Sequence, residues 1–513
     1  MGQTDNQSLA VFRFDAGVRL GGGHAARCSA LAEALERRGW RCGFAIGPGG
    51  AVAIPALARS GKVVIELDAN EVDGGTSEAA ALRRHWPDGC ALLVVDHYGL
   101  DAAFESACRP WAASILVIDD LADRRHDCDL LSNAAPGCTA LDYRAYVPDH
   151  CRLLVGSTYA LLREEFWADR STVLPRRIAP RATKLLISFG ASDPENHSAT
   201  AIDAATQVGL TSGLDVILGA ASPHRATIES QVSELGGRVL VNVKDMTAPI
   251  AEAELAVGAG GLSALERCCL GLPTLLLPIA DNQRRNIEGL ANAGAAGALE
   301  PPLTATRIAD ALLALAEDQS ARTAMSTAGT VLCDGLGAAR LATAAAPHRC
   351  ARDGLAVTLR PVMQDDCDTI LDWQRQPATR RFSPDPTPPT ELEHSTWLAA
   401  KLGDPGCVFN MILHGEQTAG VVRLDRLATG DGYEVSINVD PEHQGKGIAS
   451  IALALIRDLI YEARFLARIH PSNTASLTLF ENAGYRPGDD EGWYVSPAIP
   501  TSADGELDRS VHP

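Results

Sequence analysis

The sequence contains no apolar run near the roughly 20 residues needed to cross a bilayer, and it contains no Cys-x-x-Cys pair. Its first residues, Met1–Leu9, lack the charged and then apolar layout of a signal peptide. The 13 cysteines are an odd number scattered along the chain, so we expect reduced thiols rather than a disulfide framework or a zinc site. Together these absences predict a cytoplasmic protein that has no membrane partner.

Basic residues are also scarce, because 45 Lys and Arg stand against 64 Asp and Glu, and the formal net charge is −19. An acidic chain is poorly suited to a phosphate backbone, so we expect no nucleic-acid partner. Gly and Pro are scattered without a period, which excludes a collagen-like or low-complexity chain. The 46% of hydrophobic residues is typical of globular proteins, and the length of 513 residues predicts about three domains.

Short apolar runs alternate with amphipathic helical patterns over the first two-thirds of the chain. Val11–Phe14 and Ala91–Val95 are typical of buried parallel strands, and the apolar positions of Cys28–Leu35 share one face of a helix. A polar, proline-bearing stretch at 168–183 interrupts the alternation, which restarts at Lys184–Phe189. This order predicts two successive open α/β sheets with a cleft between them.

The pattern changes after residue 349, where predicted strands follow one another without intervening helices. Val408–Leu413, Thr418–Leu424 and Tyr433–Val439 are spaced as antiparallel strands, and a helical pattern follows at Ile448–Glu462. The predicted fold class is therefore α/β, with two Rossmann-like domains followed by a smaller α+β domain. The predicted domain boundaries are residues 8–167, 184–346 and 355–498.

A glycine-rich turn that carries a histidine, Gly21-Gly22-Gly23-His24, follows the first predicted strand and leads into a helix. Glycines let the backbone approach a ligand closely, and a helix N-terminus favours anions. The turn would lie at the carboxyl edge of the sheet, where open α/β folds bind ligands. An imidazole there suits general-base catalysis, although the same pattern is also typical of a plain tight turn.

The segment Arg13–Ala34 resembles the opening of the UDP-sugar hydrolases of pseudaminic acid biosynthesis. Further signatures of that family follow in order, at Asp96–Tyr98, Asp119–Asp129, Leu185–Asn196 and Gly258–Asn286. The resemblance implies two Rossmann-like domains in a GT-B-like arrangement. It also implies cleavage of the anomeric C–O bond of a UDP-linked diacetamido-trideoxy-altrose without a metal, with His24 as the base that takes a proton from water.

The resemblance also implies roles for other residues of the cleft. Asp15 would orient His24 or shape its turn, and Tyr98 would lie near the base. Glu266 would accept the ribose hydroxyls, and Ser263 would supply a hydroxyl that the family carries at the position of Leu262. Each side chain also has an ordinary structural interpretation, such as a surface ion pair or a polar turn. The predicted substrate-binding residues are Gly22, Gly23, Gly190, Ser192, Gly260, Gly261, Ser263, Glu266, Asp281, Asn282 and Gln283.

A second glycine-rich turn, Gln444–Ala449, follows the predicted strand Tyr433–Val439 and opens a helix. Small residues there let consecutive backbone N–H groups face a pyrophosphate. With Asn473–Tyr485 downstream, the turn resembles the acyl-CoA loop of the GNAT acetyltransferases, and the resemblance, which covers Val357–Val495, implies acetyl-CoA as co-substrate. The predicted CoA-binding residues are Val439, Gln444, Gly445, Lys446, Gly447, Ile448, Ala449, Asn473 and Ser476.

The catalytic groups of this second site are harder to assign from the sequence. Many GNAT enzymes place a tyrosine as general acid where this chain has Phe480, and a phenyl ring cannot donate a proton. Tyr485, Ser476 or water would have to serve instead. Glu434 is the expected base, directly or through water, although it is also an ordinary carboxylate at a strand edge.

The two resemblances together predict a bifunctional enzyme. A UDP-linked sugar with an amine at C4 would be N-acetylated with acetyl-CoA, and the product would then lose UDP. Leu359–Phe382 also resembles the start of the acetyltransferase of the same sugar pathway, whose other enzymes are expected partners. Two alternatives stay open, namely a GT-B glycosyltransferase fused to an acetyltransferase and a sugar-nucleotide-binding protein with an inactive GNAT domain.

Overall fold

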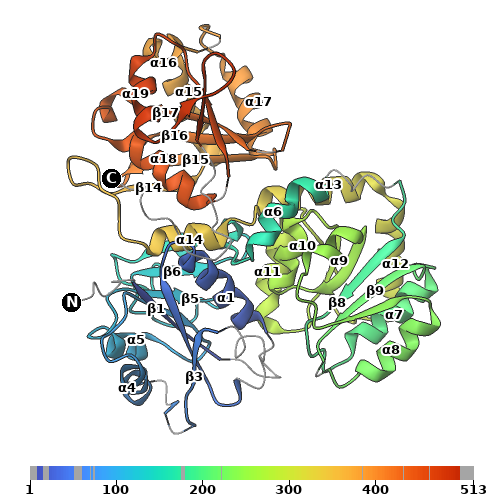
Figure 1. Cartoon of the computed structure of the whole chain (residues 1–513). Coiled ribbons are helices and arrows are strands. Elements are labelled where there is room, and N and C mark those ends of the chain that lie inside the picture. Colours follow the sequence, from blue (N-terminus) through green and yellow to red (C-terminus); the bar gives the residue numbers. More distant parts are fainter. Residues whose placement is uncertain are drawn as a thin grey trace. The chain divides into compact units, whose positions relative to one another are not determined.

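The computed structural model divides the chain into two compact units, unit 1 (Met1–Ala345) and unit 2 (Ala346–Pro513), shown in Figure 1. Parts of some predicted segments lie outside the described residues, namely Gly21 of the first glycine turn, residues 175–179 of the interrupting stretch, and Glu462 and residues 497–498 of the predicted third domain. The described residues are 8–15, 22–50, 61–69, 71–72, 75–174, 180–220, 222–383, 385–430, 432–461 and 463–496.

The first sheet of unit 1 has seven parallel strands in the order β3-β2-β1-β4-β5-β6-β7. The strand order reverses at β1, between β2 and β4, and doubly wound sheets bind ligands beyond the carboxyl ends of the strands at such a point. The strands are β1 (Leu9–Phe14), β2 (Arg41–Ile46), β3 (Val63–Glu66), β4 (Leu92–Asp96), β5 (Ile115–Ile118), β6 (Leu130–Asn133) and β7 (Arg152–Val155). The longer helices of this half are α1 (Gly23–Glu36), α4 (Thr76–His85) and α5 (Ala102–Cys108).

The second sheet has six parallel strands in the order β10-β9-β8-β11-β12-β13, and its order reverses at β8. Its branched apolar strands are buried because helices cover both faces. The strands are β8 (Lys184–Ser188), β9 (Gly213–Leu218), β10 (Arg238–Val241), β11 (Leu255–Ala259), β12 (Thr274–Leu277) and β13 (Gly297–Ala298). The helices are α7 (His197–Gln207), α8 (Arg225–Glu234), α9 (Thr247–Glu252), α10 (Leu262–Cys269), α11 (Arg284–Asn292), α12 (Ala305–Glu317) and α13 (Gln319–Leu332), and η4 (Asp281–Gln283) is a single 3₁₀ turn.

Two helices connect the halves of unit 1. The first part of the interrupting stretch at 168–183 belongs to α6 (Glu164–Val173). At the end of the unit, α14 (Gly337–Ala345) returns to the first half, where Leu341 packs in one core with Leu31 of α1. A Cβ at Gly337 would lie 2.2 Å from the carbonyl oxygen of Ala160, so this close approach requires glycine. The core of the first sheet is therefore completed by the last helix of the unit.

Unit 2 contains one sheet in the order β14-β15-β16-β17-β18-β20-β19. Strands β14 to β17 are antiparallel, as the sequence predicted, and β17 pairs with β18 in parallel. The strands are β14 (Val357–Pro361), β15 (Cys407–His414), β16 (Gln417–Arg426), β17 (Tyr433–Val439), β18 (Phe465–Arg468), β19 (Arg486–Pro487) and β20 (Trp493–Ser496). The helices are α15 (Cys367–Arg375), α16 (Pro377–Arg380), α17 (Glu391–Leu402), α18 (Ile448–Leu459) and α19 (Thr474–Asn482).

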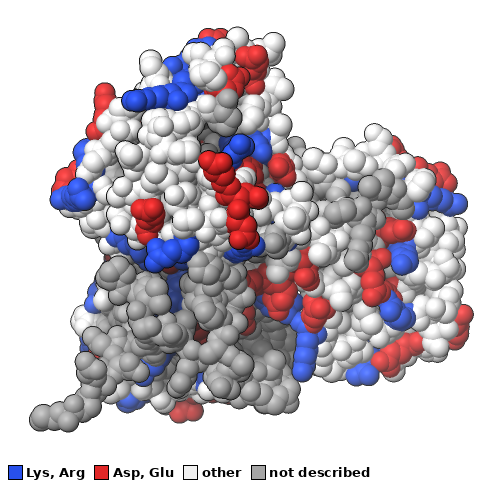
Figure 2. Space-filling view, turned by 45° about the horizontal axis from the view of Figure 1, so that its top comes forward, with Lys and Arg blue, Asp and Glu red and all other residues white. Residues whose placement is uncertain are grey.

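The predicted fold class is confirmed, because two Rossmann-like parallel sheets precede an α+β unit. None of the helices in the described part of the chain is long and apolar enough to cross a membrane. On the face drawn in Figure 2, the coloured Lys and Arg side chains are interspersed with Asp and Glu side chains.

Candidate active sites

His24 lies in the first turn of α1, and its side chain is buried. Because β4 is the neighbour of β1, its last residue, Asp96, lies at the edge from which the turn into α1 departs. Nδ1 of His24 is 2.6 Å from Oδ1 of Asp96. A carboxylate only accepts, so Nδ1 carries the proton and Nε2 is the basic nitrogen. Nε2 has no hydrogen-bond partner among the described residues, which leaves it available to a substrate.

Arg27 lies one turn further along α1 and binds two carboxylates of the site. Its Nε donates to Oδ2 of Asp96 at 2.7 Å, and its Nη1 donates to Oδ2 of Asp120 at 2.8 Å. Burial opposes the ionisation of Asp96, but the charge of Arg27 and the contact with His24 outweigh it and hold the pKa of this carboxyl well below its usual range. Asp96 is therefore a fixed anion that keeps His24 in one tautomer.

Tyr98 stands beside His24, with the ring centroids 4.9 Å apart and the ring planes nearly perpendicular. Its hydroxyl donates to Oδ2 of Asp120 at 3.3 Å and accepts from Nδ2 of Asn282 at 2.9 Å. Asn282 belongs to η4 of the second half, so these bonds connect loops from both sheets of unit 1. Burial and then the charge of Asp120 raise the pKa of Tyr98 to about 12, so this hydroxyl is a hydrogen-bond donor at neutral pH.

A second pair of a histidine and a carboxylate lies at the same edge of the first sheet. Nε2 of His97 is 2.8 Å from Oδ2 of Asp15, and Nδ1 of His97 accepts from the backbone N–H of Gly99 at 2.9 Å. Both ring nitrogens of His97 are therefore engaged within the protein. Asp15, which the sequence placed at His24 or its turn, pairs with His97 and Arg13, whereas Asp96 holds His24.

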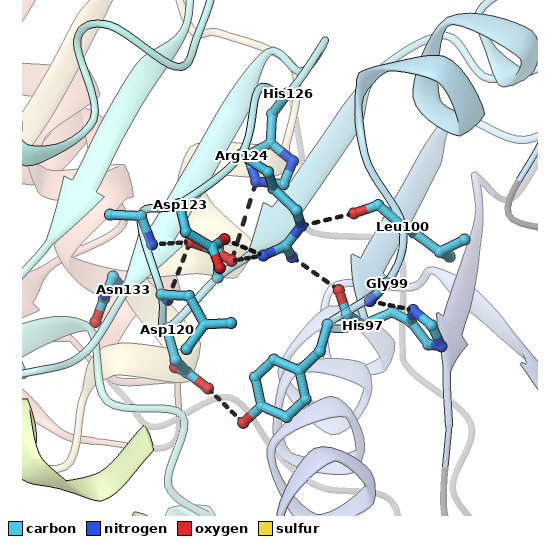
Figure 3. Close-up of polar contacts among 12 residues, drawn as sticks. His97, Gly99, Leu100, Asp120, Asp123, Arg124, His126 and Asn133 are labelled. Carbon is cyan, nitrogen blue, oxygen red and sulfur yellow. Dashed lines mark hydrogen bonds and ion pairs between the residues drawn. The ribbon is translucent and has the colours of Figure 1, made fainter. Parts of the chain in front are cut away.

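Arg124 ties together the loops that follow β4 and β5, as Figure 3 shows. It donates to the carbonyl oxygen of His97 at 2.8 Å and lies 2.7 Å from Oδ1 of the buried Asp119. Tyr98 directly follows His97 in the sequence, and Asp120 directly follows Asp119. The ion pair therefore fixes the backbone that brings the hydroxyl and the carboxylate together.

The glycine turn after β11 is braced by the segment that follows β12. The backbone N–H of Gly260 donates to Oε1 of Gln283 at 3.1 Å, and Asn286 donates to the carbonyl oxygen of Gly260. A Cβ at Gly260 would lie 2.2 Å from a side-chain carbon of Ile287, so only glycine fits there. The amide oxygen of Gln283, predicted to bind substrate, is thus engaged with the turn itself.

The other predicted residues of this half lie at the carboxyl ends of its central strands or on the helix that follows. Burial raises the pKa of Glu266 on α10, and the charge of Arg163 opposes this effect. Asp281 is exposed and pairs with Arg284 at 3.1 Å. Gly190 has a φ of 90°, a conformation that favours glycine. The turns after β8 and β11 also contain Ser192, Gly261 and Ser263.

In unit 2, the loop Gln444–Gly447 connects β17 to α18. Gly445 and Gly447 have φ values of 76° and 84°, which glycine adopts without strain. Nε2 of Gln444 donates to the carbonyl oxygen of Val439, the last residue of β17, at 3.0 Å and closes the loop. Ile448 and Ala449 form the first turn of α18, whose N–H groups have no partner within the helix.

The described pairing of β17 with β18 is confined to Tyr433 and Glu434, so the predicted base lies at the end of the paired region. Asn473 and Ser476, both predicted to bind CoA, lie at the start of α19. The side chain of Asn473 caps this helix by accepting from the backbone N–H of Ser476 at 3.2 Å. Asn473 is therefore engaged in capping, and Ser476 lies in the first turn of that helix.

Phe480 and Tyr485 pack edge to face, with ring centroids 4.9 Å apart, and both are buried. Burial raises the pKa of Tyr485 to about 12, although the charge of Arg457 and a hydrogen bond with it oppose this effect. A tyrosine with 3% of its surface exposed has little access to a leaving thiolate. This arrangement favours Ser476 or water over Tyr485 as the proton donor.

Sequence reasoning missed Arg27, Asp120 and the role of Asp96. Arg27 follows His24 by three residues, a spacing that puts both on one face of α1. Asp96 directly follows a buried strand, but its contact with His24 depends on β4 lying beside β1. Among the described residues, no group of three or more His, Cys, Asp or Glu could hold a metal ion.

Comparison with known proteins gives matches to both predicted families. Residues 356–486 match the family described as an acetyltransferase (GNAT) domain. An uncharacterized protein of Methanocaldococcus jannaschii is 21% identical over 492 residues, which are 92% of this chain and 95% of that protein. The crystal structure of MurG of Acinetobacter baumannii is 17% identical with a TM-score of 0.48, covering 65% of this chain and 98% of its own.

The UDP-2,4-diacetamido-2,4,6-trideoxy-beta-L-altropyranose hydrolase of Campylobacter jejuni is 28% identical over 134 residues, which are 26% of this chain and 46% of that enzyme. The chain thus matches less than half the length of that relative. It therefore combines partial homology to this UDP-sugar hydrolase with a C-terminal GNAT acetyltransferase domain.

Proposed function

We propose that this chain is a bifunctional nucleotide-sugar enzyme. Unit 2 transfers an acetyl group from acetyl-CoA to the amine at C4 of a UDP-linked amino sugar. Unit 1 then hydrolyses the anomeric C–O bond of the diacetamido product and releases UDP and the free sugar. The partial homology to the UDP-sugar hydrolase and the acetyltransferase match support this pairing of activities.

The observation that carries the hydrolase proposal is the state of His24. Its Nδ1 is held by Asp96 at 2.6 Å, and its Nε2 is left as a base at the carboxyl edge of the sheet. The neighbouring His97 cannot take this role, because Asp15 and Gly99 engage both of its nitrogens. These contacts support His24, rather than His97, as the general base of the proposed reaction.

The proposed hydrolysis uses this geometry. Water attacks C1 of the sugar, and Nε2 of His24 takes one of its protons while Asp96 stabilises the imidazolium that forms. The C1–O bond breaks, and its electron pair goes to the phosphate oxygen of UDP, which leaves as an anion without being protonated. Tyr98 and Asn282, whose side chains are hydrogen-bonded at 2.9 Å, come from the two halves of unit 1 and would contact the sugar. The N-terminus of α10 suits the diphosphate.

The acetylation follows the chemistry of the second loop. The N–H groups at Gln444–Ala449 and the first turn of α18 bind the pyrophosphate of acetyl-CoA. The sugar amine attacks the thioester carbonyl, Glu434 takes the amine proton directly or through water, and the thiolate leaves with a proton from Ser476 or water. Glu434 suits this role because it lies where β17 stops pairing with β18.

The test is to incubate the purified full chain with a UDP-4-amino sugar and acetyl-CoA and to identify the products by mass spectrometry and NMR. We expect free diacetamido sugar, UDP and CoA. UDP release that requires an added acceptor hydroxyl would instead identify a glycosyltransferase. Binding of acetyl-CoA without any CoA release from several amino sugars would show that the acetyltransferase site is inactive.

A further inference from the structure

The segment ahead of the acetyltransferase domain contacts the glycine-rich loop of unit 2. Residues 349–357 form a turn whose ends are joined by a backbone hydrogen bond of 2.9 Å. Within it, the backbone N–H of Arg352 donates to the carbonyl oxygen of Lys446 at 3.0 Å, and Nη1 of Arg352 donates to that of Gly445 at 3.1 Å. The family match begins at residue 356, so Arg352 lies ahead of the matched residues.

These two bonds determine where the N–H groups of the loop point. In a trans peptide group, the C=O and the following N–H point in opposite directions. The carbonyl of Gly445 faces Arg352, so the N–H of Lys446 points away from Arg352. The carbonyl of Lys446 also faces Arg352, so the N–H of Gly447 points away from Arg352 as well. Consecutive N–H groups on one side of a loop form a concave anion site.

We infer that Arg352 is a positioning residue for the pyrophosphate of acetyl-CoA, which acts by holding the two carbonyls so that the N–H groups of Lys446 and Gly447 face the ligand. This inference rests on the acetyl-CoA role proposed above. Arg352 acts through the loop, and its side chain is exposed, so its substitution removes little packing from the unit.

The same turn reaches the start of the loop through Asp353. Its Oδ1 accepts from Nε2 of His414 at 2.9 Å, and Nδ1 of His414 lies 3.0 Å from Nδ1 of His443, the residue before Gln444. Because His414 donates from Nε2, its neutral form accepts from His443 at Nδ1. Both histidines are buried. Asp353 therefore supports the start of the loop through His414 and His443, and Arg352 supports its middle at Gly445 and Lys446.

The experiment measures CoA binding to the full chain by isothermal titration calorimetry. We expect Arg352→Ala to raise the Kd for CoA about tenfold, because one charged hydrogen bond to the loop is lost while the backbone bond stays. Arg352→Lys restores part of the affinity, since an ammonium group can still donate to Gly445. The matched control is Arg349→Ala. Arg349 lies in the same 349–357 turn, and its substitution removes an ion pair with Asp458 of α18 but should leave the Kd unchanged.

A kinetic measurement separates positioning from damage to the unit. Arg352→Ala should raise the KM for acetyl-CoA and leave kcat at saturating acetyl-CoA close to that of the wild type. Equal CoA affinities of the wild type and Arg352→Ala overturn the inference and leave the proposed function in place. A wild-type chain that does not bind CoA overturns both.

Discussion

Nδ1 of His24 and Oδ1 of Asp96 lie 2.6 Å apart, and this contact joins the first turn of α1 to the last residue of β4. A buried carboxylate on one nitrogen of an imidazole fixes the tautomer and stabilises the protonated form that arises when the other nitrogen takes a proton. The pair therefore prepares Nε2 of His24 for one chemical task.

Replacing His24 by glutamine should lower UDP release by about 10²–10⁴-fold, the usual contribution of a general base. Release of CoA from acetyl-CoA should be unchanged, because that reaction belongs to unit 2. The matched control is His97→Gln, which removes a histidine from the same edge whose nitrogens are both engaged. Its loss of UDP release should be much smaller. Full UDP release by His24→Gln would show that another group is the base.

Replacing Asp96 or Asp15 by asparagine distinguishes the roles of these two carboxylates. Asp96→Asn should lower kcat for UDP release by about 10³–10⁴-fold, because an amide can hold the imidazole in the wrong tautomer. Asp15→Asn changes the partner of His97 instead and should leave kcat within about tenfold of the wild type. Steady-state kinetics of both variants provide the measurement. A larger loss in Asp15→Asn than in Asp96→Asn would contradict the assignment.

The low pKa of Asp96 predicts a pH dependence of stability. Its folded pKa lies well below the unfolded value of about 3.9. Its contribution is therefore fully present above that unfolded value and is lost as the pH falls toward the folded value. The wild type should have a higher free energy of unfolding than Asp96→Asn at about pH 5, and this advantage should shrink as the pH falls below about 4. Urea unfolding at a series of pH values measures it.

The control for this series is Asp88→Asn, which changes an exposed carboxylate of the same half. Its difference from the wild type should stay near zero at every pH. A wild-type advantage over Asp96→Asn that persists undiminished well below pH 4 would mean that the stabilisation does not come from the ionised carboxyl.

The proton donor and base of unit 2 can be tested by a pair of variants. Tyr485→Phe should retain acetylation, because the hydroxyl is buried and lies with Arg457. Glu434→Gln should lower kcat by about 10²-fold or more if the carboxylate takes the amine proton. Release of CoA thiol with a UDP-4-amino sugar is the measurement. Loss of acetylation in Tyr485→Phe, with CoA binding intact, would identify that tyrosine as the acid.

Much of the fold could be predicted because its central strands are short, branched and bounded by turn residues. Tyr433–Val439 was predicted with the bounds of β17, and the predicted run Lys184–Phe189 extends one residue past the end of β8. The antiparallel character of unit 2 followed from the short spacing of its strands. Some strands were missed, among them the edge strand β3, whose four residues include none that is fully buried. An edge strand has a weaker apolar pattern because one side faces solvent.

The site was predicted where local sequence determines it and missed where distant elements meet. His24 could be placed at a helix start from the glycines before it. Its partner could not, because the sequence offers Asp15 one residue after β1, whereas Asp96 comes from a strand 72 residues away. Likewise, nothing local shows that Tyr98 accepts a hydrogen bond from Asn282, since that contact depends on how the two halves of unit 1 meet.

The return of α14 to the first half has a consequence for how this chain can be divided. Leu341 fills the same core as Leu31, so the first half consists of two stretches of chain separated by the entire second half. A cut anywhere in between would leave α1 with an uncovered apolar face. Exchange of either half between related chains would accordingly require two junctions, and a fragment meant to fold as unit 1 alone has to extend through Ala345.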